Sequence, residues 1–430
     1  MIPADFAIRR IGLLATLAGS VPRNGPAMRD LGTLTDAAVA VSEGRIAWVG
    51  ADADLDREVV LASSARMLDA EGAAVVPGLV DPHTHLVFAG DRDDELRRRL
   101  AGASYREIAA AGGGIVRSVD ATRRASVADL AAGVEARLDE MLLCGTTTAE
   151  VKSGYGLETG AELRSLEAIH HAASRHPVTV VSTFLGAHEV PLDYRGRRED
   201  YVSLVVEQMI PAVAEQGLAE FGDVFCEEGV FTVEESRRIL LATRDHGMKL
   251  RIHADELAWT GGAELAAELG ARSADHLGFV SEAGMKALAA ASCVATLLPS
   301  ATFFLRLGHY APARSIIEAG APVALASDIN PGGGLSPSLP FAMSVGCFSM
   351  GLALEEALVA VTANAAFSLD RFGEVGSIEV GKRGDLVVLR SARLLDLVRV
   401  GVGAVGTVVK GGRVVVRDGR RVDESPEAAS

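Results

Sequence analysis

The chain reads Ala74-Val75-Val76-Pro77-Gly78-Leu79-Val80-Asp81-Pro82-His83-Thr84-His85, an apolar run that ends in two histidines one residue apart. A short, nearly continuous apolar run is typical of a strand buried on both faces of a parallel sheet. Because alternate residues of an extended chain point the same way, His83 and His85 can both reach one ion. Two nearby histidines are more often incidental than metal-binding, but a buried strand that delivers both together favours a metal site.

Five more apolar runs end in the same way, with a chemically capable side chain at or just past the end of the run. They cover residues 146–151 before Lys152, 178–185 before His188, 249–252 before His253, 273–275 before His276 and 323–327 before Asp328. Helix-length amphipathic segments separate them. Strand–helix units repeated over about 300 residues predict an α/β fold, a (β/α)8 TIM-like barrel, which places its active site at the C-terminal ends of its strands.

Four of these residues, His83, His85, His253 and Asp328, form a predicted metal site. Three imidazoles and one carboxylate suit Zn²⁺ or a similar borderline divalent ion, and they also suit iron. A catalytic site must keep a position for water, so we expect five-coordinate geometry when water is bound. The alternative is a set of separate core histidines and an N-capping aspartate, but four matches at predicted strand ends favour the metal site.

Two further side chains are predicted to move protons at this site. Glu256 follows His253 by three residues and can act on the water as a general base, with Asp255 as the local competitor. His276 follows another strand and can assist proton transfer and polarise a carbonyl. For His276 the alternative is a structural, hydrogen-bonded histidine.

Both ends of the chain show a different pattern, with short strands and glycine turns at residues 36–41, 46–50, 385–389 and 405–416. We therefore predict a small β-sandwich domain formed by both chain ends, residues 1–72 and 373–422, around a catalytic barrel of residues 73–372. Residues 423–430 are expected to form a flexible tail. Arg9-Arg10 and the apolar residues 11–18 loosely imitate a secretory signal, but their short length favours a first β-strand.

Composition excludes several classes of partner. The formal net charge of −15 disfavours nucleic acid, and no apolar run reaches the roughly 18 residues that span a bilayer. The four cysteines lie far apart without CxxC spacing, so we expect reduced thiols in a cytoplasmic protein and neither disulfides nor a zinc–thiolate site.

Seven segments carry a more specific resemblance: residues 88–92, 104–108, 112–115, 150–157, 183–188, 253–257 and 327–332. With them, residues 75–390 resemble the amidohydrolase superfamily and, within it, the imidazolonepropionases. The His-x-His and Asp motifs mark the superfamily, whereas segments 152–157 and 185–188 are more selective. One departure is Gly333, which stands where the family usually has Ser or Thr.

The resemblance implies hydrolysis of the cyclic amide C–N bond of 4-imidazolone-5-propanoate to N-formimidoyl-L-glutamate by a metal-activated water. It implies one metal ion per subunit, Zn²⁺ or Fe³⁺, on the four predicted ligands, a small-molecule substrate and a homodimer. The catalytic residues would be Glu256, His276 and Asp328. The substrate would contact Arg92, Tyr105, Tyr155, His188, Glu256, Asn330, Gly332 and Gly333. An Arg can hold the propionate carboxylate by a bidentate pair, which agrees with Arg92 in that role.

Three alternatives bear on these expectations. Some related enzymes bridge two metals with a carboxylated lysine, but the resembled family needs one metal, so Lys152 is interpreted as structural or outer-shell. A deaminase of a heterocyclic amine would use the same metal–water chemistry in a different pocket. A non-catalytic protein on the same fold would normally have lost its metal ligands, and all four are present here.

Overall fold

The computed structural model describes residues 1–103, 107 and 115–422. These residues form two compact units, one made of residues 1–82, 139–148 and the described residues from 338 onward, the other of residues 83–138 and 149–337. The domain boundaries expected from the sequence, at 72/73 and 372/373, stay a prediction. The expected flexible tail at 423–430 lies outside the described residues.

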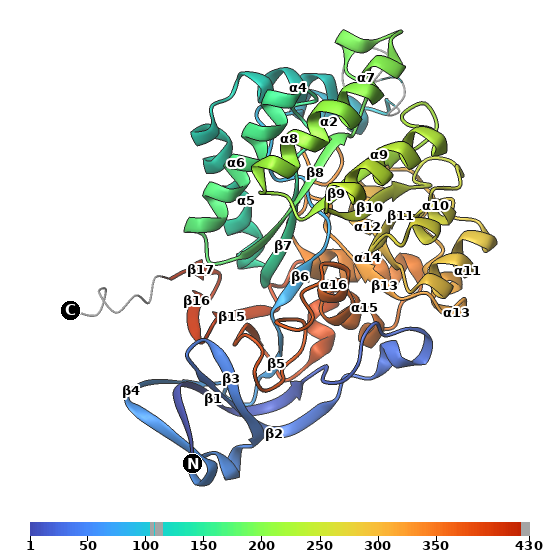
Figure 1. The fold of residues 1–430 in the computed structure, drawn as a ribbon. Coiled ribbons are helices and arrows are strands. Elements are labelled where there is room, and N and C mark those ends of the chain that lie inside the picture. The colour runs from blue at the N-terminus through green and yellow to red at the C-terminus, as the bar shows by residue number, and fades with distance from the viewer. Residues whose placement is uncertain (104–106, 108–114, 423–430) are drawn as a thin grey trace. The chain divides into compact units, whose positions relative to one another are not determined.

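Both chain ends contribute to one nine-stranded sheet, ordered β17-β16-β15-β14-β5-β1-β2-β3, with β4 also paired to β1. Its strands are β1 (Ile2–Ala15), β2 (Thr33–Ser42), β3 (Arg45–Ala51), β4 (Val59–Asp69), β5 (Ala74–Pro77), β14 (Leu386–Leu389), β15 (Val405–Lys410), β16 (Arg413–Arg417) and β17 (Arg420–Arg421). The blue N-terminal and red C-terminal strands meet where β5 pairs antiparallel with β14 (Figure 1). The expected separate sheet from the two chain ends is confirmed. Residues 11–15 belong to β1, as the first-strand interpretation predicts.

The second sheet has eight parallel strands in the order β13-β12-β11-β10-β9-β8-β7-β6. They are β6 (Leu79–Asp81), β7 (Thr146–Lys152), β8 (Thr179–Ala187), β9 (Phe221–Cys226), β10 (Lys249–Ala254), β11 (Ser273–His276), β12 (Val294–Leu297) and β13 (Val323–Leu325). The segments after β13 and after β6 join, since Asp328 N–H donates to His83 O (3.1 Å) and His85 N–H to Ile329 O (2.9 Å). The predicted (β/α)8 barrel is confirmed.

Helices connect and cover the barrel strands (Figure 1). Those in the connections are α2 (Asp93–Leu100), α4 (Ile115–Arg124), α5 (Val127–Leu143), α6 (Thr159–Arg175), α7 (Arg198–Leu204), α8 (Ile210–Gln216), α9 (Val233–Asp245), α10 (Gly262–Leu269), α11 (Glu282–Ala291), α12 (Pro299–Leu305) and α13 (Ala313–Glu318). The remaining helices are α1 (Leu55–Glu58), α14 (Leu339–Met350), α15 (Leu354–Ala360) and α16 (Ala363–Ser368). Among the described residues, no helix combines the length and apolarity needed to cross a membrane. All four cysteines carry free thiols, as predicted.

The run 74–80 differs from its prediction, because it forms two strands in two different sheets. The change occurs at Gly78, whose N–H donates to Asp385 O at 2.8 Å. A Cβ at this position would lie 2.2 Å from Thr147 Oγ1, so the crossing requires glycine. Strands β9 and β12 were not predicted. β9 has Gly and Asp within its apolar run, and β12 is only four residues long.

Candidate active site

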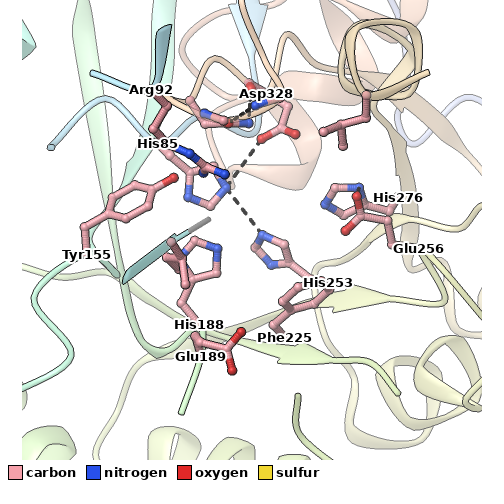
Figure 2. Close-up of a pocket in the computed structure, with 15 residues that line it drawn as sticks. His85, Arg92, Tyr155, His188, Glu189, Phe225, His253, Glu256, His276 and Asp328 are labelled. Carbon is pink, nitrogen blue, oxygen red and sulfur yellow. Dashed lines mark hydrogen bonds and ion pairs between the residues drawn. The ribbon is translucent and has the colours of Figure 1, made fainter. Parts of the chain in front are cut away.

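Three imidazole rings converge where β6 and β10 end. His83 Nε2 lies 3.2 Å from His85 Nε2, and His253 Nε2 lies 3.4 Å from the same atom. Asp328 joins them from the chain beyond β13. Its Oδ1 lies 3.4 Å from His85 Nε2 (Figure 2) and 3.6 Å from His83 Nε2. All four side chains are buried. The structure therefore brings together the four residues that the sequence proposed as a metal site.

Two buried carboxylates fix the orientation of two of these rings, those of His83 and His253. Asp275 Oδ2 lies 2.6 Å from His83 Nδ1, and Asp223 Oδ1 lies 3.1 Å from His253 Nδ1. Since a carboxylate accepts, each Nδ1 carries a proton, and each Nε2 is the ring nitrogen that is directed toward the other rings. Burial lowers the pKa of His83 and of His85 well below the usual range, so both rings are neutral.

A metal ion fits this donor set. Around a tetrahedral ion with metal–nitrogen bonds of about 2.0–2.1 Å, ligand atoms lie about 3.4 Å apart. The separations of 3.2, 3.4 and 3.6 Å bracket that value. Lone pairs that face one another this closely repel unless a cation lies between them. His83, His85 and His253 thus form a cluster that could hold a metal ion.

Glu256 and His276 lie beside the cluster, with Glu256 Oε1 3.5 Å from His276 Nδ1. Burial, followed by the charges of Asp328 and Glu227, raises the pKa of Glu256 well above its usual range. Burial, followed by His253, lowers the pKa of His276 well below its usual range. A carboxyl that readily keeps a proton next to an imidazole that readily gives one up is an arrangement suited to proton transfer.

The cluster forms the floor of a pocket of about 630 Å³ that opens to solvent. Its lining includes His85, Arg92, Tyr155, His188, Glu189, Phe225, Glu256, Leu305 and Gly333. Arg92 is held in place because its Nε and Nη2 donate to Glu95 Oε2 at 2.9 and 2.6 Å. The guanidinium also packs against the chain at Gly332, where a Cβ would lie 2.1 Å from Nη1. A fixed cation on the pocket wall is suited to binding an anionic group.

Tyr155 and His188 lie side by side on the pocket wall, with ring centroids 5.3 Å apart in an edge-to-face arrangement (Figure 2). His188 Nδ1 donates to Gly154 O at 2.9 Å, which leaves Nε2 as an acceptor. Burial lowers the pKa of His188 to about 3, so the ring is neutral. His188 also stacks on His85 at 5.0 Å. A flat heterocycle with an N–H donor would suit this wall.

The turn after Asp328 is held by Asn330. Asn330 Oδ1 accepts from the N–H groups of Gly332 and Gly333 at 2.8 and 2.6 Å, and its Nδ2 donates to Asp328 O at 2.8 Å. In this conformation the two glycine N–H groups bind Asn330. A Cβ at Gly333 would lie 2.8 Å from Leu305 Cγ, so Leu305 fills the space that a larger residue would need.

The structure thus gathers every predicted site residue except Tyr105, which lies outside the described residues. Sequence reasoning missed the carboxylates of Asp223 and Asp275 and the pocket wall formed by Glu189, Phe225 and Leu305. A usable signal existed for both aspartates. Asp223 interrupts an apolar run three residues before the run ends at Cys226, and Asp275 stands directly before His276. Nothing local marks Leu305.

Comparisons with known proteins agree with this geometry. The model of the amidohydrolase family matches residues 74–415. The chain is 51% identical to the imidazolonepropionase of Symbiobacterium thermophilum, over 98% of this chain and 99% of that protein. It is 48% identical to the imidazolonepropionase of Geobacillus sp. (strain WCH70), over 96% and 98%. Among solved structures, an adenosine deaminase from Xanthomonas campestris with bound zinc has a TM-score of 0.74 at 19% identity, over 99% of this chain and 96% of that one.

The solved structure supports the fold alone, because its sequence identity is low. The family model and the full-length relatives go further, since they span the barrel and both chain ends. The chain therefore belongs to the amidohydrolase family and, within it, to the imidazolonepropionase family.

Proposed function

We propose that this chain hydrolyses 4-imidazolone-5-propanoate to N-formimidoyl-L-glutamate. The observation that carries the proposal is the His83–His85–His253 cluster with Asp328 at the floor of a pocket walled by Arg92, Tyr155 and His188. Full-length relatives named imidazolonepropionase, 45–51% identical to this chain, support the choice of substrate.

The ligands in this proposal are His83, His85, His253 and Asp328, which hold one Zn²⁺ or Fe³⁺ per subunit. When bound, the ion would lower the pKa of a coordinated water to about 7 and so supply a nucleophile near neutral pH. The donor set of three imidazoles and one carboxylate supports the choice of a zinc-like ion. Elemental analysis of protein purified without added metal decides between zinc and iron.

The chain's own residues then bind and orient the substrate. Arg92 pairs with the propionate carboxylate, and Glu95 keeps the guanidinium in the pocket wall. His188 Nε2 accepts a ring N–H, and Tyr155, which packs edge-to-face against His188, contacts the substrate beside it. Tyr105 and the Asn330 turn are further proposed substrate contacts.

Proton transfer falls to the Glu256–His276 pair. Water attacks the ring carbonyl carbon, and the pair accepts the proton that the water loses. The C–N bond then breaks, and the pair returns a proton to the departing ring nitrogen. Glu256 and His276 are close enough, at 3.5 Å, to pass a proton between them.

The test is to incubate purified protein with freshly prepared imidazolonepropionate and to follow the loss of ring absorbance. Turnover should stop after chelation and return when Zn²⁺ or iron is added back. Ammonia release from an aminated heterocycle, with no imidazolone turnover, would instead identify a deaminase.

We further propose that the protein works as a homodimer in the cytoplasm, on a small-molecule substrate and without a nucleic-acid or membrane partner. A mass measurement by light scattering at micromolar concentration tests the dimer.

A further inference from the structure

A cluster of buried charges lies in the barrel interior behind the histidines. It comprises Glu150 and Lys152 on β7, Asp223 on β9, Arg251 on β10 and Asp275 on β11, and each of these side chains is fully buried. Three carboxylates therefore share a closed space with two cations. The proposed chemistry uses none of the five directly, so their presence needs another explanation, because burying unpaired charge is costly.

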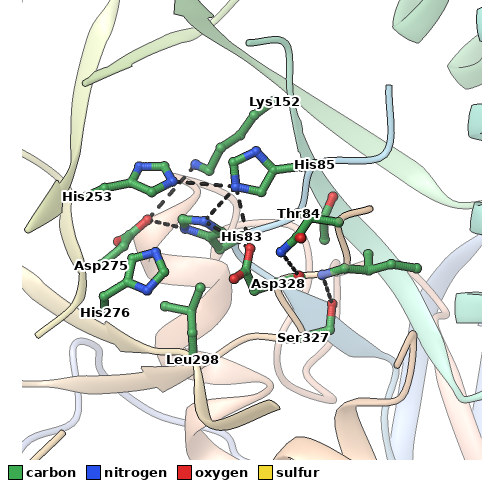
Figure 3. A network of polar contacts seen from close by, with 12 residues as sticks. His83, Thr84, His85, Lys152, His253, Asp275, His276, Leu298, Ser327 and Asp328 are labelled. Atoms are coloured by element: carbon green, nitrogen blue, oxygen red, sulfur yellow. Dashed lines mark hydrogen bonds and ion pairs between the residues drawn. The ribbon is translucent and has the colours of Figure 1, made fainter. Parts of the chain in front are cut away.

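Lys152 is the member that links the most groups. Its Nζ lies 2.8 Å from Glu150 Oε1, 2.8 Å from Asp223 Oδ2 and 4.0 Å from Asp275 Oδ2. The side chain reaches from β7 past β8 to carboxylates on β9 and β11, and Figure 3 shows its contact with Asp275 on β11. Burial works against its charge, but Asp223 and Glu150 outweigh burial and raise the pKa of Lys152. Lys152 is therefore an ammonium.

The two aspartates that Lys152 approaches are the same two that orient the histidine rings. Asp223 uses Oδ2 for Lys152 and Oδ1 for His253, while Asp275 Oδ2 lies beside His83 Nδ1. The contacts thus run from the ammonium through a carboxylate to an imidazole whose Nε2 faces the proposed ion. Without Lys152, Glu150 and Asp223 would face each other with no cation between them.

We propose that Lys152 is a positioning residue of the metal centre, whose ammonium holds the carboxylate of Asp223 and, through it, the ring of His253. This inference rests on the metal site of the proposed function but not on its substrate. The proposal and simple electrostatics predict opposite changes in metal affinity when Lys152 is replaced. Removing a cation near a metal site should strengthen metal binding by electrostatics alone, whereas loss of a group that orients a ligand weakens it, typically 10–100-fold.

The experiment compares Zn²⁺ affinity, measured by chelator competition, in the wild type and in Lys152→Met. The matched control is Lys410→Met, which removes a partly buried lysine, 2.5 Å from Asp385, in the compact unit that does not contain the histidine cluster. Both variants should lose thermal stability as metal-free proteins. Only Lys152→Met should weaken Zn²⁺ binding, by about 10–100-fold, and change the visible spectrum of the Co²⁺-loaded protein.

A double-variant cycle separates action through Asp223 from general destabilisation. Asp223→Asn should weaken Zn²⁺ binding by itself, and adding Lys152→Met to it should cause little further loss, because the two residues act in series. If Lys152→Met does not fold, Lys152→Gln takes its place under the same criteria, since it keeps an N–H donor and loses the charge.

Unchanged or tighter Zn²⁺ binding in the Lys152 variant would overturn the proposal, as would a full additional loss in the double variant. Neither readout uses imidazolone turnover. A wild-type protein that binds Zn²⁺ but does not open the ring would refute the proposed function alone.

Discussion

Glu162 allows a test of how the part of the pocket wall that carries Tyr155 and His188 is held in place. Its carboxylate is fully buried and accepts three backbone N–H groups, from Gly154 at 3.0 Å and from Gly156 and Leu157 at 2.8 Å. These residues flank Tyr155. Gly154 is itself in the left-handed region, at φ +112°, and its carbonyl accepts from His188. Loosening this turn should therefore disturb both Tyr155 and His188.

The change Glu162→Gln keeps the size of the side chain and replaces one oxygen by an NH₂ group. At least one of the three N–H groups then meets a donor instead of an acceptor. A buried donor left without a partner costs about 1–3 kcal/mol. If that cost falls on the substrate-binding conformation of the turn, kcat/KM drops by about 5- to 150-fold.

The assay is steady-state ring opening across pH 6–9, with metal content measured on the same samples. Burial raises the pKa of Glu162, so the difference between the two proteins should be largest at alkaline pH, where the carboxyl is ionised. Glu356→Gln is the matched control: Glu356 is equally buried and accepts from Ala353 N–H, in the unit without the pocket. Wild-type KM and kcat in Glu162→Gln at every pH would refute this reasoning.

Three further outcomes are expected. Asp328→Asn should abolish turnover and lower the metal content of purified protein, as elemental analysis would reveal; full metal retention would remove Asp328 from the ligand set. Arg92→Ala should raise KM by about 10–100-fold with a smaller effect on kcat, because a charge-assisted pair contributes about 1.5–3 kcal/mol. A normal KM would show that Arg92 does not bind the carboxylate of the substrate. Since the folded-state pKa of Glu256 is raised, its contribution to stability is present below the unfolded-state pKa and is lost as pH rises. Metal-free Glu256→Gln should therefore melt above the metal-free wild type at pH 8, and the gap should close toward pH 4.5, the ordinary pKa of the group; a gap independent of pH would contradict this.

Sequence reasoning found the four proposed ligands, which the structure brings together, because a barrel collects strand ends in one place. His83, His85, His253 and Asp328 lie up to 245 positions apart in sequence (83 to 328), yet each follows a short apolar run. The period of a buried strand and the chemistry of its last residue are both local properties. In a (β/α)8 barrel the C-terminal ends of all the strands lie at one face, so residues that follow different strands come close together.

The groups that support the ligands could not be read in the same way. Asp223 lies within an unpredicted strand, and its partner His253 is 30 positions away. Lys152 ends a predicted strand, but its contacts with Asp223 and Asp275 depend on which strands face each other across the barrel interior. Likewise, Leu305 fills the space beside Gly333 only because α12 lies against that turn.

By itself, then, the sequence determined the alternation of strands and helices, the convergence of the four proposed ligands and the pairing of the chain ends in one sheet. Tertiary structure alone decided that residues 74–80 divide between two sheets at Gly78, and that five buried charges lie behind the histidines. The physical reason is that the spacing of apolar residues and the identity of the residue that follows a strand can both be read from a few neighbouring positions. Desolvated charges, in contrast, are stable only where partners from distant strands meet them.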